Sequence, residues 1–212
     1  MLEENMPVGD LVRKYAWARE IEAWTVAVIA DKTAADVAAV YGAKGDSLVG
    51  DHNFGQLRDL QGQDPLELRH HVQIFEHDRH VVTVENNGWS GSHPEIARRS
   101  STESGHFFSV YWNVNAFGLV TEAKDGAITA RFEMLYPIAP SQESGEVRPP
   151  WAIGPEPDTA VVRQTCLALM EQQTGEAFDP YWLGQQYPTY QIPDPHALYR
   201  DVENADKLNG ES

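Results

Sequence analysis

The hydrophobic pattern of the chain alternates between short apolar runs and segments whose apolar residues recur at helical spacing. Residues 24–30 (WTVAVIA) are apolar almost throughout, which is typical of a strand buried on both faces. Two β-branched runs flank Asp78-Arg79 and predict a hairpin. Asp125-Gly126 between two later runs is a second strong hairpin signal. The predicted strands are residues 24–30, 72–77, 80–86, 106–113, 117–123 and 127–135.

Helices are predicted between these runs by capping residues. Asp10 is placed to cap a first helix in which apolar residues recur at helical spacing. Thr33 and Asp36 fit a capping box, and Gly42 stands where the C-terminus of the following helix is expected. Residues 43–69 are polar and contain glycine, so we expect a loop there.

The second half of the chain contains two more predicted helices and a proline-rich break. Ser92 and Glu95 fit a Ser-x-x-Glu capping box for a helix over about residues 94–99. Prolines recur through 136–157 and predict an extended connector. Residues 158–175 then have the apolar spacing of a helix.

The order of these elements predicts an α+β fold. We expect a mixed or antiparallel sheet with split β-α-β (ferredoxin-like) order plus an added β-meander, and a helical, proline-rich C-terminal extension. The chain is thereby divided into an α+β core domain at 1–135, a connector at 136–157, and a helical, aromatic extension at 158–212 that packs on the core.

The composition of the chain excludes some classes of partner but says little about the fold. The chain has 212 residues, of which 42% are apolar, and this suffices for one globular core. Its 32 acidic and 16 basic residues give a formal net charge of −16, which repels nucleic acid backbones and anionic lipids. We therefore expect no nucleic acid and no membrane partner. The surplus charge either keeps the protein soluble or forms an acidic face for a basic protein.

The single cysteine and the N-terminus bear on location. Cys166 is the only cysteine, and it lies among apolar residues at helical spacing, so we expect a buried, inert thiol in a reducing compartment. The N-terminal segment lacks the apolar core of a secretory signal, and no apolar run approaches the length of a membrane span. These features predict a cytoplasmic protein.

No local motif identifies a catalytic site. The GWSG stretch around Ser90 lacks the fifth-position glycine of a nucleophile elbow, so we predict that Ser90 is not a nucleophile. His77 and His80 are expected to face each other across the hairpin close to Glu76 and Asp78, which could suit zinc, although polar residues beside turns are ordinarily solvated. We predict no catalytic residue, no metal site and no cofactor.

The C-terminal third combines aromatic residues with an acidic surplus. Residues 141–212 contain 12 acidic and 4 basic side chains. Tyrosine and tryptophan are frequent at protein interfaces because they bury a large area and keep a polar group, but we expect at least half of them to pack the tail on the sheet. The predicted partner-binding residues are Trp151, Tyr181, Trp182, Tyr187, Tyr190, Glu143, Glu146, Glu156, Asp194 and Asp201.

Two stretches, ENNGWSGSHPEIARRSS and FSVYWNVNAFGLVTEAKDGAITARFE, carry a family resemblance. They resemble a family of uncharacterised actinobacterial proteins that is defined only by a domain of unknown function. The features that carry the resemblance are Glu85, Asn87-Gly88, Gly91, Tyr111–Asn115 and Asp125-Gly126. The resemblance covers about residues 15–135, and it implies a fold and a lineage but no activity.

Three classes of function remain open. The first is a protein-recognition module, such as an acidic immunity or inhibitor-like protein that captures a basic protein partner with the help of electrostatic steering. The second is a structural or scaffold component of a larger assembly. The third is an enzyme whose active site lies near the His77 and His80 hairpin. The acidic surplus, the aromatic C-terminal third and the missing catalytic signature together favour recognition, although many active sites leave no local motif.

Overall fold

The computed structural model describes residues 8–62, 68–115, 117–134, 146–152 and 159–207. The strands are β1 (Trp24–Ala30), β2 (Leu48–His52), β3 (His70–His77), β4 (His80–Asn86), β5 (His106–Trp112), β6 (Gly118–Lys124), β7 (Ala127–Glu133) and β8 (Tyr187–Ile192). The helices are α1 (Val8–Lys14), α2 (Ala34–Val40), α3 (Phe54–Leu60), α4 (Pro94–Ser100), α5 (Val162–Thr174) and α6 (Pro195–Leu198). Short 3-10 turns are η1 (Ala16–Glu20), η3 (Ser90–Ser92), η4 (Pro150–Ala152), η5 (Thr159–Val161) and η6 (Pro180–Gly184).

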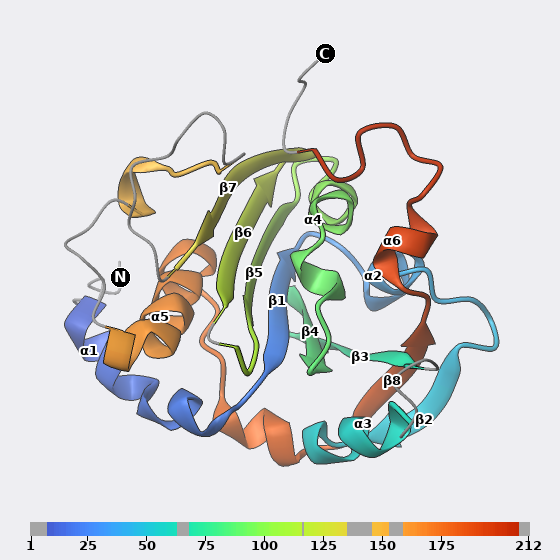
Figure 1. Ribbon diagram of the computed structural model, residues 1–212, viewed down its shortest axis with the longest axis horizontal. Coiled ribbons are helices and arrows are strands. Elements are labelled where there is room, and N and C mark those ends of the chain that lie inside the picture. Colours follow the sequence, from blue (N-terminus) through green and yellow to red (C-terminus); the bar gives the residue numbers. More distant parts are fainter. Residues whose placement is uncertain (1–7, 63–67, 116, 135–145, 153–158, 208–212) are drawn as a thin grey trace.

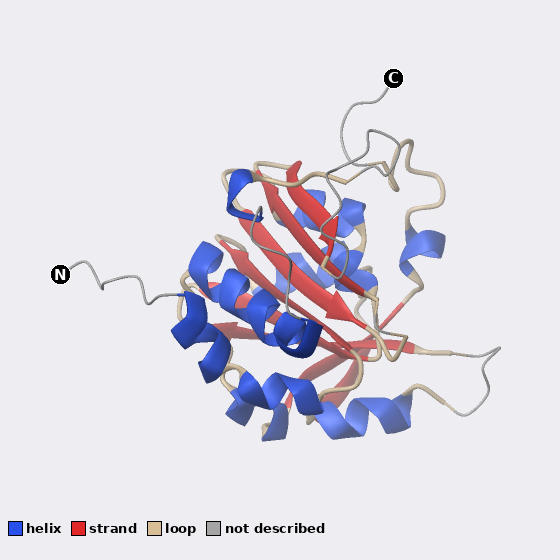
Figure 2. Cartoon of the chain, turned by 60° about the vertical axis from the view of Figure 1, so that its left-hand side comes forward, coloured by secondary structure: helices blue, strands red, loops and turns tan. Residues whose placement is uncertain are grey.

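One eight-stranded sheet forms the middle layer of the molecule (Figure 1). Its order is β2-β8-β3-β4-β1-β5-β6-β7, and every neighbouring pair is antiparallel. Helices lie on both faces of the sheet, with α1 and α5 packed together on one of them (Figure 2). The α+β class and the antiparallel sheet are therefore confirmed.

The central strand β1 explains why its sequence is apolar throughout. Trp24, Val26 and Val28 point into the core beneath α1 and α5. Ala27 and Ile29 point into a second core, which is closed by α2 and α4. A strand that is covered on both faces has no solvent-facing positions, so the usual alternation with polar residues disappears.

Most of the predicted elements are confirmed. Each of the six predicted runs contains a strand of the sheet, and the first hairpin turns at Asp78-Arg79. Thr33 and Asp36 form the predicted capping box. Asp125 and Gly126 have φ angles of 50° and 76°, which suit a tight hairpin turn between β6 and β7.

The predicted capping box at Ser92 is wrong. The N-cap of α4 is His93, whose Nδ1 accepts the backbone N–H of Glu95 at 3.2 Å. Ser92 lies in η3 and donates its hydroxyl to the carbonyl of Trp89 at 2.7 Å. Glu95 pairs with Arg98 and Arg99 on its own helix instead of reaching back. Asp10 likewise lies in the first turn of α1 and not at its N-cap.

Residues 43–69 were expected to form a loop, and this expectation is wrong for most of their described part. They contain β2 and α3, and Asn53 and Gln56 form a capping box at the start of α3. The C-terminal extension contains the helix expected at 158–175, observed as η5 and α5. It also supplies β8, which lies between β2 and β3 and thus within the sheet itself. Much of the predicted connector at 136–157 lies outside the described residues.

Candidate functional site

A cleft of about 650 Å³ opens on the α4 face of the sheet, where β5 and β7 end and β6 begins. Its walls come from η3 and the first turn of α4, from the loop between β5 and β6, from β7, and from α6 with the segment that follows it. Four widely separated parts of the chain therefore meet at this cleft. Cavities of several hundred Å³ are the size in which proteins hold small molecules or partner side chains.

Glu85 holds the η3 loop in place below the cleft. It is fully buried at the end of β4, and its carboxylate accepts the backbone N–H groups of Ser90 at 2.9 Å and Gly91 at 2.7 Å. A Cβ atom on Gly88 would lie 2.5 Å from Glu85 Oε2, and one on Gly91 would lie 2.8 Å from the Tyr41 hydroxyl. A side chain at either position would force these neighbours to move, so glycine fits both positions best. Burial raises the pKa of Glu85 to about 7, although the two N–H donors oppose that shift.

His93 presents a buried proton donor to the cleft. Only 2% of the residue is exposed. Its Nδ1 accepts the capping N–H of Glu95, and burial lowers its pKa, so the ring is neutral at pH 7 with its proton at Nε2. Nε2 lies 3.1 Å from Asp206 Oδ1 but has no hydrogen bond of acceptable geometry within the described residues. His93 is therefore a buried donor without a satisfactory acceptor.

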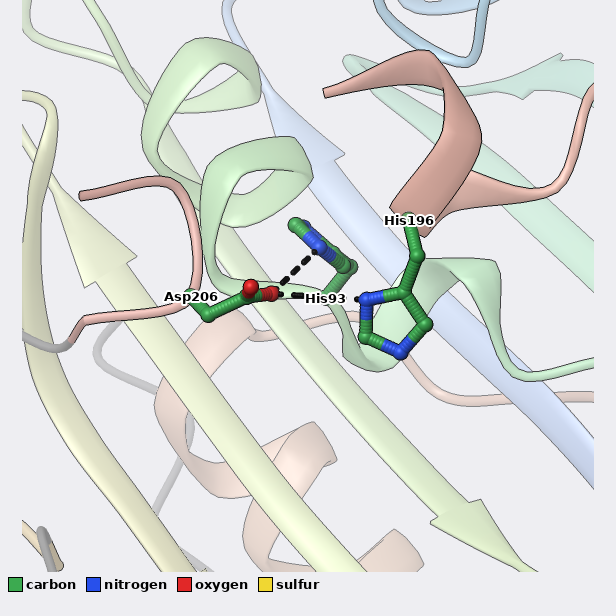
Figure 3. Close-up of side chains that lie close together, drawn as sticks. All are labelled: His93, His196 and Asp206. Atoms are coloured by element: carbon green, nitrogen blue, oxygen red, sulfur yellow. Dashed lines mark ion pairs between the residues drawn. The ribbon is translucent and has the colours of Figure 1, made fainter. Parts of the chain in front are cut away.

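Asp206 and His196 stand opposite His93 (Figure 3). Asp206 Oδ1 lies 3.4 Å from His196 Nδ1, and the two side chains are 73% and 62% exposed. The His196 ring lies beside Trp89, with a centroid separation of 4.6 Å. Arg98 holds the backbone before and after Asp206 through the carbonyl groups of Asn204, Ala205 and Lys207. The backbone around Asp206 is thus fixed by Arg98, and its exposed carboxylate lies in ion-pair contact with the two histidines.

Two histidines and a carboxylate are a ligand set that zinc accepts. One ligand atom from each of His93, His196 and Asp206 lies within 4.8 Å of the others. However, the capping hydrogen bond to Nδ1 keeps the ring proton of His93 on Nε2, the nitrogen that faces the cluster. Coordination through Nε2 would require this proton to leave while the cap is retained. The arrangement therefore favours an oxygen acceptor over a metal ion.

Arg131 places a cationic group beside His93. Its Nη1 donates to the carbonyl of Ser92 and to Thr121 Oγ1, the latter at 3.1 Å. No carboxylate among the described residues lies within ion-pair distance of it. Burial lowers the pKa of Arg131 to about 10, which leaves the guanidinium charged at pH 7.

The other end of the cleft is acidic and aromatic. Glu146 accepts the backbone N–H of Glu133 at 3.0 Å and pairs with Arg148 at 3.1 Å. Burial, and then the nearby charge of Glu146, raise the pKa of Glu133. The rings of Tyr111 and Phe117 lie 6.0 Å apart at the wall of the cleft, and 39% of Phe117 is exposed.

The predicted histidine hairpin forms a second cluster, but with a different carboxylate. His77 Nδ1 lies 2.9 Å from Glu176 Oε1, and His80 Nδ1 lies 2.8 Å from Glu176 Oε2. Glu176 follows α5 and is 5% exposed. Glu76, which was expected beside the histidines, accepts the backbone N–H of Ala34 instead. Asp78 does lie close, because its carboxylate, Glu176 and His77 offer ligand atoms within 4.8 Å of one another.

The aromatic residues predicted to bind a partner are mostly packed on the sheet. Trp182 is 7% exposed and contacts Phe75 and Phe178. The partly buried rings of Trp151, Tyr187 and Tyr190 pack against the two cores, whereas Tyr181 is 68% exposed.

The predicted acidic residues have different environments. Glu146 lines the cleft, Asp194 caps α6, and Asp201 is exposed. Glu143 and Glu156 lie outside the described residues.

The buried thiol expected at Cys166 is confirmed, since that residue is 2% exposed. Ser90, which we predict is not a nucleophile, is 1% exposed.

Residues 11–161 match the profile of a family of unknown function, DUF6461. The match covers more than half of the chain, so the protein belongs to this family, as the resemblance to a family of unknown function predicted. No curated protein and no solved structure matches the chain. Among the described residues, no helix has the length and apolar character that crossing a membrane requires.

Proposed function

We propose that the protein is a recognition module that binds a basic protein partner, and that the cleft beside α4 and β7 receives cationic side chains of that partner. The observation that carries the proposal is the lining of the cleft. Three carboxylates, from Glu133, Glu146 and Asp206, share it with the rings of Trp89, Tyr111 and Phe117.

A guanidinium or ammonium group is the chemical complement of this lining. Carboxylates bind such groups by charge-assisted hydrogen bonds, and aromatic faces attract cations. The charge of Glu146 is a cause, after burial, of the raised pKa of Glu133, although Arg148 opposes this shift. A cation that entered beside Glu133 and Glu146 would reduce the repulsion between the two carboxylates.

The net charge favours the same class of partner. At −16 the whole molecule attracts a basic protein over long range and would speed their association at low salt. An immunity or inhibitor-like role is one form of this recognition.

Affinity capture with matched variants tests the proposal. The wild-type protein, Glu133→Gln/Glu146→Gln and Glu20→Gln/Glu103→Gln are each used as bait for cell extract at low and physiological salt. The two variants change the charge equally, but Glu20 and Glu103 are exposed, with side chains 75% and 87% accessible, and neither lines the cleft. We expect wild type and the Glu20/Glu103 variant to capture the same basic protein, and the cleft variant to lose it. Equal capture by both variants would contradict the proposal.

We further infer that the centre of the sheet has the split β-α-β order of ferredoxin-like folds. The adjacent antiparallel strands β3-β4-β1-β5 support this interpretation, as does the position of α2 and α4 in one apolar core on one face. A solved structure of another family member in which these strands are ordered differently would contradict it.

A further inference from the structure

The inner end of the cleft contains donors that the protein itself does not satisfy. The Nε2–H of His93 is buried without a hydrogen bond of acceptable geometry, and Arg131 uses only Nη1 in the hydrogen bonds of the described residues. Buried donors are normally paired, so an Nε2–H without a hydrogen bond of acceptable geometry beside the buried guanidinium of Arg131 points to an anionic ligand. A carboxylate has two oxygens and can accept from both groups.

Asp206 marks where such a carboxylate would lie. Its Oδ1 is 3.1 Å from His93 Nε2, and its charge acts to raise the pKa of Arg131 against the effect of burial. Yet the Asp206 side chain is 73% exposed, and its ion-pair contacts among the described residues are those to His93 at 3.1 Å and His196 at 3.4 Å. The carboxylate of a ligand that takes its place at His93 therefore has to replace these two contacts as Asp206 turns toward solvent.

The opposite charges of the cleft are ordered along β7. Arg131 and Glu133 lie on the same face of the strand two residues apart, so their Cα atoms are about 7 Å apart. An extended lysine or arginine residue places its cationic group roughly 6–8 Å from its own carboxylate, counting bonds of standard length. A single basic residue with a free carboxylate is therefore long enough to extend from the position of Arg131 on the strand to that of Glu133.

We propose that the cleft binds the carboxyl-terminal residue of the partner, and that this residue is a lysine or an arginine. Its carboxylate accepts from His93 and Arg131 in place of Asp206, and its side chain lies between the aromatic rings and reaches Glu133 and Glu146. This assignment rests on the proposed function, because it names the part of the basic partner that enters the cleft. Capture of a chain end by backbone or side-chain donors is a known mode of peptide recognition.

Fluorescent peptides test the assignment directly. The probe is a glycine- and serine-rich pentapeptide with a dye at its N-terminus and arginine at its C-terminus, titrated with the full-length protein and followed by anisotropy. We expect the free-acid peptide to bind at least tenfold more tightly than its carboxamide and than the free-acid peptide ending in glutamine. Equal binding of acid and amide would overturn the assignment. Free arginine and the unlabelled peptide are compared as competitors. If free arginine displaces the probe at a concentration equal to or lower than that of the unlabelled peptide, the cleft is a site for the amino acid and not for a peptide terminus, and the assignment is overturned.

Asp206→Asn provides a variant whose expected effect is a gain. It removes the carboxylate that competes for His93 and Arg131, and its exposed position keeps the fold unaffected. We expect it to bind the arginine-terminated free acid at least threefold more tightly than wild type and the carboxamide no more tightly. Unchanged or weaker binding of the free acid would contradict the role given to Asp206. If the peptides fail while capture of a basic protein still depends on Glu133 and Glu146, only this assignment fails and the proposed function stands.

Discussion

The molecule contains two histidine–carboxylate clusters that differ in which partner is buried. At the β3–β4 hairpin the carboxylate is the buried group that contacts both histidines. Glu176 is 5% exposed, and each of its oxygens has a histidine nitrogen within 2.9 Å. At the cleft the imidazole is the buried group: His93 is 2% exposed, whereas the side chain of Asp206 is 73% exposed. Similar residue types are thus arranged in opposite ways.

This difference separates a structural connection from a binding site. Glu176 follows α5 and ties the C-terminal extension to the hairpin, and both oxygens of its buried carboxylate are paired. A satisfied buried network stabilises the fold and offers little to a ligand. The cleft leaves His93 Nε2 without an acceptor of adequate geometry. A ligand with an acceptor atom can therefore form a hydrogen bond to His93 that the fold itself does not form.

Glu176→Ala should have the largest effect on stability of any change discussed here. It removes two hydrogen bonds to a charged carboxylate and leaves the buried His80 unpaired, so we expect the free energy of unfolding to fall by about 4 kcal/mol. Urea denaturation measures it, with Glu20→Ala as the exposed control. Peptide binding at the cleft should be unchanged at temperatures where the variant is folded. A loss below about 1 kcal/mol would show that the hairpin cluster is not a structural connection.

Glu85 should make the loop below the cleft sensitive to pH. Its folded-state pKa of about 7 lies above the ordinary value of 4.5, so the folded protein holds this proton more tightly than the unfolded chain. The stabilisation is complete below about pH 4.5 and is lost as the pH rises toward 7, a change of about 3 kcal/mol. The comparison is the pH dependence of unfolding in wild type and Glu85→Gln. The variant should lack this decline between pH 4.5 and 7, and parallel curves would contradict the assignment.

Sequence patterns predicted the elements whose signals are local. The capping box of Thr33 and Asp36 and the turn at Asp125-Gly126 depend on residues within a few positions of each other, and both are confirmed. The strand β2 was missed because it is a short edge strand with an exposed, glycine-containing sequence. Its pairing partner β8 begins with Tyr187-Pro188, and proline argues against a strand in the middle of a sheet.

Neither cluster could be completed from the sequence, because the carboxylates come from distant segments. Glu176 lies 96 residues from His80, and only the fold brings them together. Asp206 approaches His93 for the same reason. The cap at His93 was missed because capping patterns are built on Ser, Thr, Asp and Asn, whereas here an imidazole nitrogen accepts the N–H. The Pro-Glu pair after His93 was the available signal that the helix begins there, since proline is common in the first turn of a helix.

His93→Asn would separate the two roles of this residue. Asparagine is a good N-cap, so the start of α4 should remain intact, and we expect a loss of only about 1 kcal/mol in the free energy of unfolding. The donor at the position of Nε2 is lost, however, so binding of the arginine-terminated peptide should weaken at least tenfold. Thermal denaturation and anisotropy measure the two effects on the same samples. Tight binding by a folded variant would show that the buried donor of His93 does not contact the ligand.

Asp206→Asn should have the smallest effect on stability and so gives the sharpest contrast with Glu176→Ala. The Asp206 side chain is 73% exposed, and His93 is neutral at pH 7 because burial lowers its pKa, so no strong ion pair is lost. We expect the free energy of unfolding to change by less than about 0.5 kcal/mol at pH 7. Urea denaturation of the two variants side by side measures the contrast. If Asp206→Asn lost stability on the scale of Glu176→Ala, the carboxylate at the cleft would be a structural connection like the one at the hairpin, and a ligand carboxylate could not displace it without unfolding the segment that follows α6.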